Sequence, residues 1–173
     1  SADEIYQIAE ELDWDLVMSN HSPLNEVSPA EKAYHEKIPL SLLWNNSTFN
    51  FPQGLIRGQK LDLLVSNTFS SAYFVTDFDK LPIPYRCVAV DLEEGNIRVF
   101  DSGYLGEAVR ASMAIPSVFP PKEIDDRLYV DGGLIRNFPV EENIQMGSDI
   151  LIGVYVGSKK EKRDKLNSMF AIL

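Results

Sequence analysis

Leu128-Tyr129-Val130-Asp131-Gly132-Gly133-Leu134 is the stretch around which this chain is organised. Three apolar residues with strand character run into one carboxylate, and two glycines follow at once. Asp-Gly between apolar runs is a strong signal for a hairpin turn, which is the commoner interpretation of so short a stretch. A lone carboxylate at a strand end, beside glycines that leave the backbone bare, is also a way to present a general base. The stretch alone leaves both interpretations open.

Length and composition indicate one ordinary globular domain. The chain has 173 residues, of which 45% are hydrophobic and 24% charged, enough for a sizeable core. The formal net charge of −10 argues against nucleic acid as a partner, because phosphate backbones need a basic face. The same charge gives no attraction to anionic lipid, so any peripheral membrane contact would be apolar and local. No run of 18 apolar residues and no signal peptide is visible.

Few residues suit a metal or a disulfide. The one cysteine, Cys87, lies in an apolar run and is expected to be a small core residue. The two histidines, His21 and His35, lie in a polar segment and are expected at the surface rather than in a site. No His/Asp/Glu spacing suits a metal ion and no Gly-rich phosphate loop occurs, so we expect neither a metal nor a cofactor.

The sequence predicts four helices and a fifth that is cut short. Ser1 and Glu4 form a capping box before a helix that should end near Asp13-Trp14, and such a start suggests that the sequence is a fragment. Further helices are predicted from Leu61 to Phe69 (entered through Gly58), from Leu105 to Met113, and from Val140 to Ile144 (closed by Gly147), with a truncated one over 166–173.

Apolar runs between these helices predict strands. The predicted strands are Ile38 to Trp44, Tyr85 to Val90, Ile97 to Phe100, Leu128 to Asp131 and Ile150 to Val156. Val88 to Val90 is unbroken and apolar, as in a strand buried on both faces. Asp125 and Asp126 are interpreted as a turn before the Asp131 strand. Strands alternating with helices make the fold class α/β.

An apolar loop precedes the second helix. Phe49, Phe51, Leu55 and Ile56 surround Pro52 and Gly54. Such a loop could line an acyl pocket or touch a membrane, but it more often packs on its own core, which is the interpretation we favour.

The sequence offers no nucleophile of the usual kind. A serine nucleophile on an elbow is usually found in Gly-x-Ser-x-Gly, which is absent here. Ser112 lies in a predicted helix among Ala and Met and is not an elbow serine. If this chain contributes to catalysis, a carboxylate has to act as the base, and Asp131 is the best placed.

Several ordered motifs resemble the patatin-like phospholipase family. The segment Ala111 to Pro121 is similar to the one that precedes the family's Asp-Gly-Gly motif, here Asp131-Gly132-Gly133. The spacing to Asn137-Phe138-Pro139-Val140, the strand from Pro84 to Asp91 and the helix entry Gly54 to Gly58 fit as well. The match covers roughly residues 38–157 of a single domain, 1–173. The run from Ile150 to Ser158, followed by a charged helix, is similar to bacterial members of the family.

The resemblance implies a three-layer α/β hydrolase of acyl lipids that uses a Ser-Asp dyad. Serine attacks the ester carbonyl, and Asp131 takes its proton and returns it to the leaving alcohol. Gly132 and Gly133 would permit close approach because they carry no side chain. The family's oxyanion loop and elbow serine are not in this sequence, so we expect an incomplete sheet and no activity from these residues alone.

Two classes of function remain open. The first is the C-terminal part of a lipid acyl hydrolase, with a lipid or acyl ester as its substrate. The second is a non-catalytic module that binds lipid or a partner through a patatin-like partial fold. In either case an exposed sheet edge would favour self-association.

Overall fold

The main sheet is four-stranded and antiparallel, with the strand order β4-β3-β6-β5. The computed structural model describes residues 2–20, 43–45, 48–50, 54 and 56–155, and all statements below refer to these residues. The strands are two hairpins whose inner strands pair with each other, namely β3 (Cys87–Asp91), β4 (Asn96–Phe100), β5 (Lys122–Ile124) and β6 (Arg127–Asp131).

Strand β3 is the most buried element of the sheet. All five of its residues are buried, as the unbroken apolar run predicts. One side pairs with β4 over its full length, for example Val88 opposite Val99, and the other side pairs with β6, with Ala89 opposite Asp131. This second pairing brings the decisive carboxylate to the middle of the sheet.

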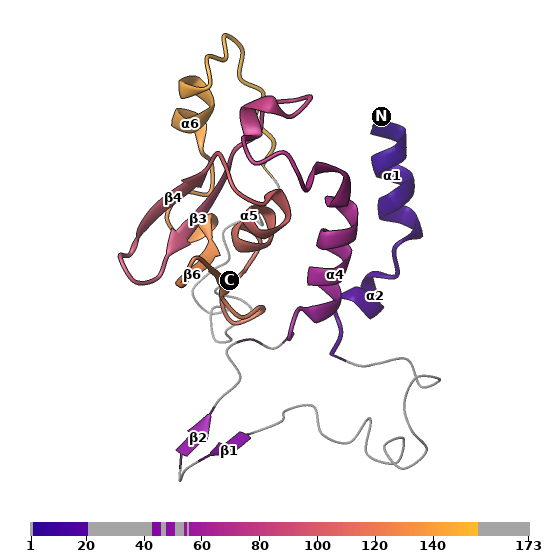
Figure 1. Ribbon diagram of the computed structural model, residues 1–173, viewed down its shortest axis with the longest axis vertical. Coiled ribbons are helices and arrows are strands. Elements are labelled where there is room, and N and C mark those ends of the chain that lie inside the picture. The colour runs from indigo at the N-terminus through magenta and orange to yellow at the C-terminus, as the bar shows by residue number, and fades with distance from the viewer. Residues whose placement is uncertain (1, 21–42, 46–47, 51–53, 55, 156–173) are drawn as a thin grey trace, which may run out of the picture.

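The four helices predicted within the described residues are present with small shifts at their ends, whereas the helix predicted over 166–173 lies outside these residues. The longer helices are α1 (Ala2–Glu11), α4 (Gln59–Thr68), α5 (Leu105–Ser112) and α6 (Val140–Gln145), and the short ones are α2 (Trp14–Val17) and the 3-10 turns η1 (Ser70–Ala72), η2 (Phe78–Lys80) and η3 (Gly132–Leu134). Figure 1 shows the sheet, α5, α4 and α1 following one another across the molecule. Mixed helices and strands confirm the predicted α/β class.

Helix α5 joins the sheet to the other helices. Its small residues Ala108 and Ala111 are buried against Cys87, Ala89 and Tyr129 of the sheet. The Cys87 thiol is thus a buried free thiol in the core, as predicted. A second core cluster lies between α4 and the segment after α5, and consists of Leu61, Val65 and Phe119 with Val17 and Ile56 packed against it.

The described part of the apolar loop packs on the core. Ile56 lies against the second cluster, and its backbone N–H donates to the Val118 carbonyl at 2.8 Å. A Cβ on Gly54 would lie 2.5 Å from the Phe119 carbonyl carbon, so only glycine fits there. The side chains of Phe49, Phe51 and Leu55 lie outside the described residues.

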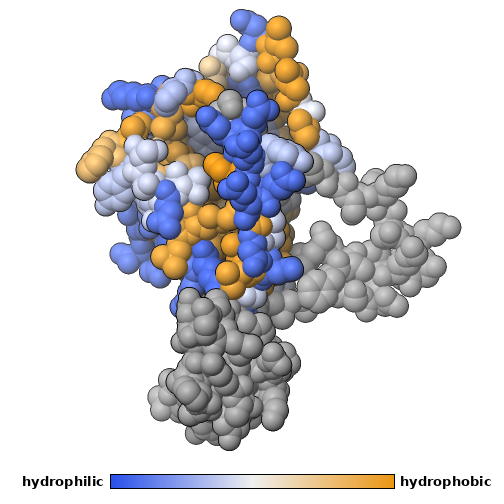
Figure 2. All heavy atoms as spheres, turned by 90° about the vertical axis from the view of Figure 1, so that its right-hand side faces the viewer, coloured by the Kyte–Doolittle hydropathy of each residue, from blue (hydrophilic) through white to orange (hydrophobic). Residues whose placement is uncertain are grey.

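Helix α1 is formed as predicted but presents its apolar residues to solvent. Ile5 and Tyr6 are 70% and 67% exposed. Figure 2 shows the face on the α1 side of the molecule, where hydrophobic and hydrophilic residues are interspersed. The helical period of this segment therefore predicted the helix correctly, while the described residues do not bury its apolar side.

The interpretation of Asp131-Gly132 as a hairpin turn is wrong. The chain turns instead one strand earlier, at Asp125 and Asp126, whose positive φ angles of 51° and 61° link β5 to β6 and confirm the turn predicted there. After Asp131 the backbone enters η3, because the carboxylate accepts the Gly133 N–H and starts a tight helical turn.

The predicted strand from Ile150 to Val156 is also wrong over its described part, 150–155. These residues form no strand, and Ile150 and Ile152 are 82% and 89% exposed. An apolar run becomes a strand only where another strand supplies hydrogen-bond partners, and none of the described strands pairs with it. The predicted strand Ile38 to Trp44 is described only at its end, where β1 (Leu43–Asn45) pairs antiparallel with β2 (Thr48–Asn50).

Candidate functional site

Asp131 is held at the end of β6 by backbone contacts on both sides. Its N–H donates to the Ala114 carbonyl at 3.0 Å, which ties the strand end to the segment after α5. Its carboxylate Oδ1 accepts the Gly133 N–H at 2.7 Å, which fixes the side-chain rotamer. Carboxylate Oδ2 accepts no hydrogen bond from the described residues. The half-buried side chain therefore presents one oxygen that is still able to accept a proton.

The two glycines after Asp131 serve different contacts. A Cβ on Gly132 would lie 2.5 Å from the Val88 carbonyl oxygen, so this glycine lets the turn pack directly on the backbone of β3. A Cβ on Gly133 would lie 3.1 Å from both Asn137 Oδ1 and Asp131 Oδ1. The second glycine therefore leaves room for the carboxylate itself. Gly132 therefore needs a bare backbone for packing, whereas a Cβ at Gly133 would displace side-chain atoms of the site, and neither glycine has a positive φ angle.

Two pockets meet at Asp131. One, of about 290 Å³, is mainly polar and includes Arg86, Arg136 and Asn137 in its wall. The other, of about 200 Å³, is lined by Ile115, Pro116 and Leu134 together with Asn137. Asp131, Gly133 and Asn137 belong to both walls. The carboxylate thus lies on the boundary between a cationic, polar pocket and an apolar one.

Arg136 is fixed in the polar pocket by three groups. Its backbone N–H donates to the Gly132 carbonyl at 2.8 Å. Its Nη1 forms an ion pair with Glu141 Oε2 at 2.8 Å and a very short one with Glu142 Oε1. Glu142 is buried at 8% exposure, so this arginine compensates a carboxylate that has been removed from water.

Arg86 contributes the second cation of the polar pocket. Its Nη1 donates to the Tyr85 carbonyl and its Nη2 to Asp79, each at 2.8 Å. The hydrogen bond from Arg86 lowers the pKa of the Asp79 carboxyl from its ordinary value. Both Nη atoms of Arg86 are therefore occupied by protein groups, namely the Tyr85 carbonyl and the Asp79 carboxylate.

The nucleophilic groups near Asp131 are not activated. Burial raises the pKa of the Cys87 thiol to about 12, so the sulfur stays protonated at neutral pH. Burial likewise raises the pKa of Tyr85, which is also in the pocket wall. Ser112 lies at the C-terminal end of α5, and its hydroxyl donates to the Val88 carbonyl at 2.8 Å. A helix end is not a strand-to-helix elbow, and this hydroxyl has a structural partner.

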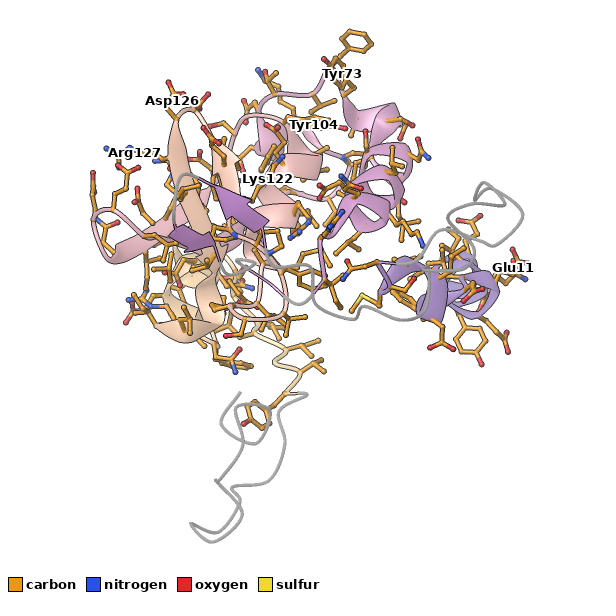
Figure 3. The ribbon with its side chains drawn as sticks, turned by 90° about the horizontal axis from the view of Figure 1, so that it is seen from below. Glu11, Tyr73, Tyr104, Lys122, Asp126 and Arg127 are labelled. Atoms are coloured by element: carbon orange, nitrogen blue, oxygen red, sulfur yellow. The ribbon has the colours of Figure 1, made fainter. Side chains whose placement is uncertain are left out.

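The other carboxylates that precede Asp131 lie elsewhere. Figure 3 shows Asp126 beside Arg127 at the turn that begins β6, at the opposite end of this strand from Asp131. Arg127 there binds Asp91 and Glu94 at 2.7 and 2.6 Å, so this cluster ties the two hairpin turns together.

Arg86, Arg136 and Asn137 are site residues that the sequence reasoning missed. In the sequence, Asn137 stands out only as part of the motif Asn137-Phe138-Pro139-Val140, and Arg136 does not stand out. One signal was available, since Arg136 follows Gly132 by four residues and a turn of that length brings it back to the Gly132 carbonyl. The pairing of Arg136 with Glu142 depends on how α6 packs and has no comparable signal.

Two kinds of feature are absent from the part of the chain that the structure describes. No group of three His, Cys, Asp or Glu residues there could hold a metal ion. None of the helices in this part has the length and apolar character needed to cross a bilayer. His21 and His35 lie outside the described residues.

Comparisons with known proteins agree on one family. A family model described as patatin-like phospholipase matches residues 1–144. An uncharacterised NTE family protein of Mycobacterium tuberculosis is 43% identical over 76 residues, which cover 44% of this chain and 21% of that protein. Patatin-like phospholipase domain-containing protein 7 of Rattus norvegicus is 31% identical over 109 residues, 62% of this chain and 8% of that protein.

A relative with a named activity is also found. Lysophospholipase NTE1 of Kluyveromyces lactis is 31% identical over 96 residues, which are 53% of this chain and 7% of that protein. The chain thus spans about a fifth or less of the length of these curated relatives.

Proposed function

Because this chain belongs to the patatin-like phospholipase family, we propose that it supplies the general base of a lipid acyl ester hydrolase, and that this base is Asp131. The observation that carries the proposal is the position of the carboxylate, fixed by the Gly133 N–H at the boundary between a polar and an apolar pocket. An acyl ester of a lipid also has its reactive carbonyl at the boundary between a polar and an apolar part.

The proposed chemistry is a Ser-Asp dyad. A serine from a Gly-x-Ser-x-Gly segment outside these 173 residues attacks the ester carbonyl while Asp131 accepts the hydroxyl proton. Asp131 then returns this proton to the leaving alcohol, and an acyl-serine remains. Water hydrolyses the acyl-serine with Asp131 again as the base.

The geometry of Asp131 suits this role. Its Oδ1 accepts the Gly133 N–H, while Oδ2 has no hydrogen-bond partner among the described residues, and Asp131 lines both pockets. A proton acceptor works best when its orientation is set before the substrate arrives, and the Gly133 contact sets it. A direct proton transfer needs Oδ2 within about 2.6–3.2 Å of the serine oxygen.

The test is turnover of a short-chain p-nitrophenyl ester by the parent protein that joins this chain to a Gly-x-Ser-x-Gly segment. We expect Asp131→Asn to lower kcat by roughly 10²–10⁴-fold, because the amide cannot take the proton. Asp126→Asn is the matched control, since it makes the same change at a turn where asparagine tolerates the positive φ of 61°. Normal turnover by Asp131→Asn would remove this residue from the mechanism.

A second function follows if the nucleophile is never supplied. The 173 residues would then act as a non-catalytic module that binds lipid in the two pockets at Asp131, and the two arginines in the wall of the polar pocket favour this candidate. The same assay separates the two. We expect no turnover from these 173 residues alone, and lipid binding without turnover by the parent protein would favour the module.

A further inference from the structure

The two pockets at Asp131 differ in a way that orients a substrate. The polar pocket holds two arginines, whereas the second is lined by Ile115, Pro116 and Leu134. Leu134 is 56% exposed, a large apolar side chain left uncovered by the described residues. An amphiphile whose ester carbonyl lies at Asp131 would therefore place its apolar chain on the Leu134 side and its headgroup on the arginine side.

The arginines are not equivalent as headgroup ligands. Arg86 is 17% exposed, and the negative charges of Asp79, Asp77 and Asp101 already offset its positive charge. Arg136 is 37% exposed and uses a single nitrogen, Nη1, for both of its carboxylate contacts. Its Nε and Nη2 donate no hydrogen bond to any described residue. These two N–H groups form the edge of the guanidinium that matches two oxygens of a phosphate group.

The carboxylates around Arg136 fix the orientation of its guanidinium and reduce its attraction for free anions. Glu141 and Glu142 hold the guanidinium at Nη1 and spare a headgroup the entropy cost of ordering a free side chain. They also oppose a highly charged anion, as does the net charge of −10. A singly charged phosphodiester that is also anchored by an apolar chain fits this balance better than free phosphate.

We propose that Arg136 is a specificity-determining residue, whose Nε and Nη2 bind the phosphate of a headgroup while the acyl chain lies along Ile115 and Leu134. This inference rests on the proposed function, because it concerns the substrate of the same site. It predicts discrimination between acyl esters that carry a phosphodiester and neutral acyl esters of equal chain length.

The test compares three probes on the 173-residue chain by NMR titration of the Gly132 and Gly133 amides and the Arg136 Nε. The probes are a lysophospholipid with a six-carbon acyl chain, the monoacylglycerol with the same chain, and inorganic phosphate. We expect the lysophospholipid to bind roughly ten-fold more tightly than the monoacylglycerol, the effect of one charge-assisted contact.

The variants assign this difference to one side chain. Arg136→Gln should bring the affinity ratio close to one, and Arg136→Lys should restore only part of it because an ammonium lacks the planar pair of donors. Arg98→Gln, an equal charge change at an exposed position on β4, should leave the ratio intact. Because Arg136→Gln leaves Glu142 buried without its cation, the double variant Arg136→Gln/Glu142→Gln serves if the single variant does not fold.

Three results would overturn the inference. They are equal affinity for the two amphiphiles in the unaltered chain, a ratio that survives the loss of Arg136, or inorganic phosphate that binds as tightly as the lysophospholipid. The Asp131→Asn assay keeps the two proposals apart. A parent protein that requires Asp131 while the ratio is one refutes this inference alone, whereas a parent indifferent to Asp131 refutes the proposed base alone.

Discussion

Replacing Gly132 by alanine tests whether the backbone packing behind Asp131 determines both stability and site geometry. The new Cβ would lie 2.5 Å from the Val88 carbonyl oxygen and 2.8 Å from its carbon, both of them backbone atoms in the middle of the sheet. Ordinary contact begins near 3.4 Å, so the turn and β3 must separate by about 0.9 Å. The Val88 carbonyl also accepts the Ser112 hydroxyl, which would be strained by the same movement.

The expected cost follows from overpacking a rigid interior. Forcing one methyl group into packed backbone costs about 1–3 kcal/mol of the free energy of unfolding. For a chain of this length that lowers the Tm by roughly 2–12 °C. Because Gly132 follows Asp131 directly, the same shift moves the carboxylate, so turnover of the parent protein should fall as well.

Gly133→Ala is the matched control for Gly132→Ala. Its Cβ would meet only side-chain atoms, Oδ1 of Asn137 and Oδ1 of Asp131, each at 3.1 Å. These atoms can rotate away, so we expect less than about 1 kcal/mol of lost stability together with a clear loss of turnover. Urea unfolding followed by circular dichroism measures the first quantity and the ester assay the second. A Gly132→Ala variant that unfolds at the same urea concentration as the unaltered chain would refute this reasoning.

Two further predictions concern ion pairs. The hydrogen bond from Arg127 lowers the pKa of Asp91 in the folded chain. The Asp91 carboxylate therefore stabilises the fold at pH values above its unfolded pKa of about 4. This contribution is lost as the pH falls further, through the lower pKa that Asp91 has in the folded chain. Asp91→Asn should therefore be less stable than the unaltered chain at pH 7, with a difference that narrows in acid unfolding curves; a constant difference would contradict the assignment. Asp62→Ala should lower the free energy of unfolding by roughly 1–2 kcal/mol, because it leaves Arg110, which is only 4% exposed, without its carboxylate. The loss is smaller than for a fully buried ion pair because Asp62 is half exposed. Arg110→Met should cost less in the same urea titration, because it removes the buried charge instead of isolating it, and the reverse order would contradict the argument.

Local signals predicted most of the elements, and long-range contacts explain the failures. The run at β3 and the period of α5 each depend on a few neighbouring residues, and both are where the sequence indicated. Asp131-Gly132 has the composition of a hairpin, but the Val88 backbone on one side and the Ala114 carbonyl on the other direct the chain into a 3-10 turn instead. The segment 150–155 has strand composition without a partner, and composition cannot supply one.

The same distinction applies to the candidate site. Asp131 could be selected from the sequence because its chemistry and its glycines are adjacent in the chain. Arg136 has only its four-residue spacing from Gly132 as a signal, because its side-chain position depends on Glu142, which a helix brings back toward it. The signal for Asp131 and its Gly133 contact lies within three consecutive residues, whereas the contacts of Arg136 extend from Gly132 to Glu142 and depend on how α6 follows the 3-10 turn. Residues that set specificity are therefore harder to find in this sequence than the proposed base, and the Arg136 titration is the experiment in which the structure contributes most beyond the motif.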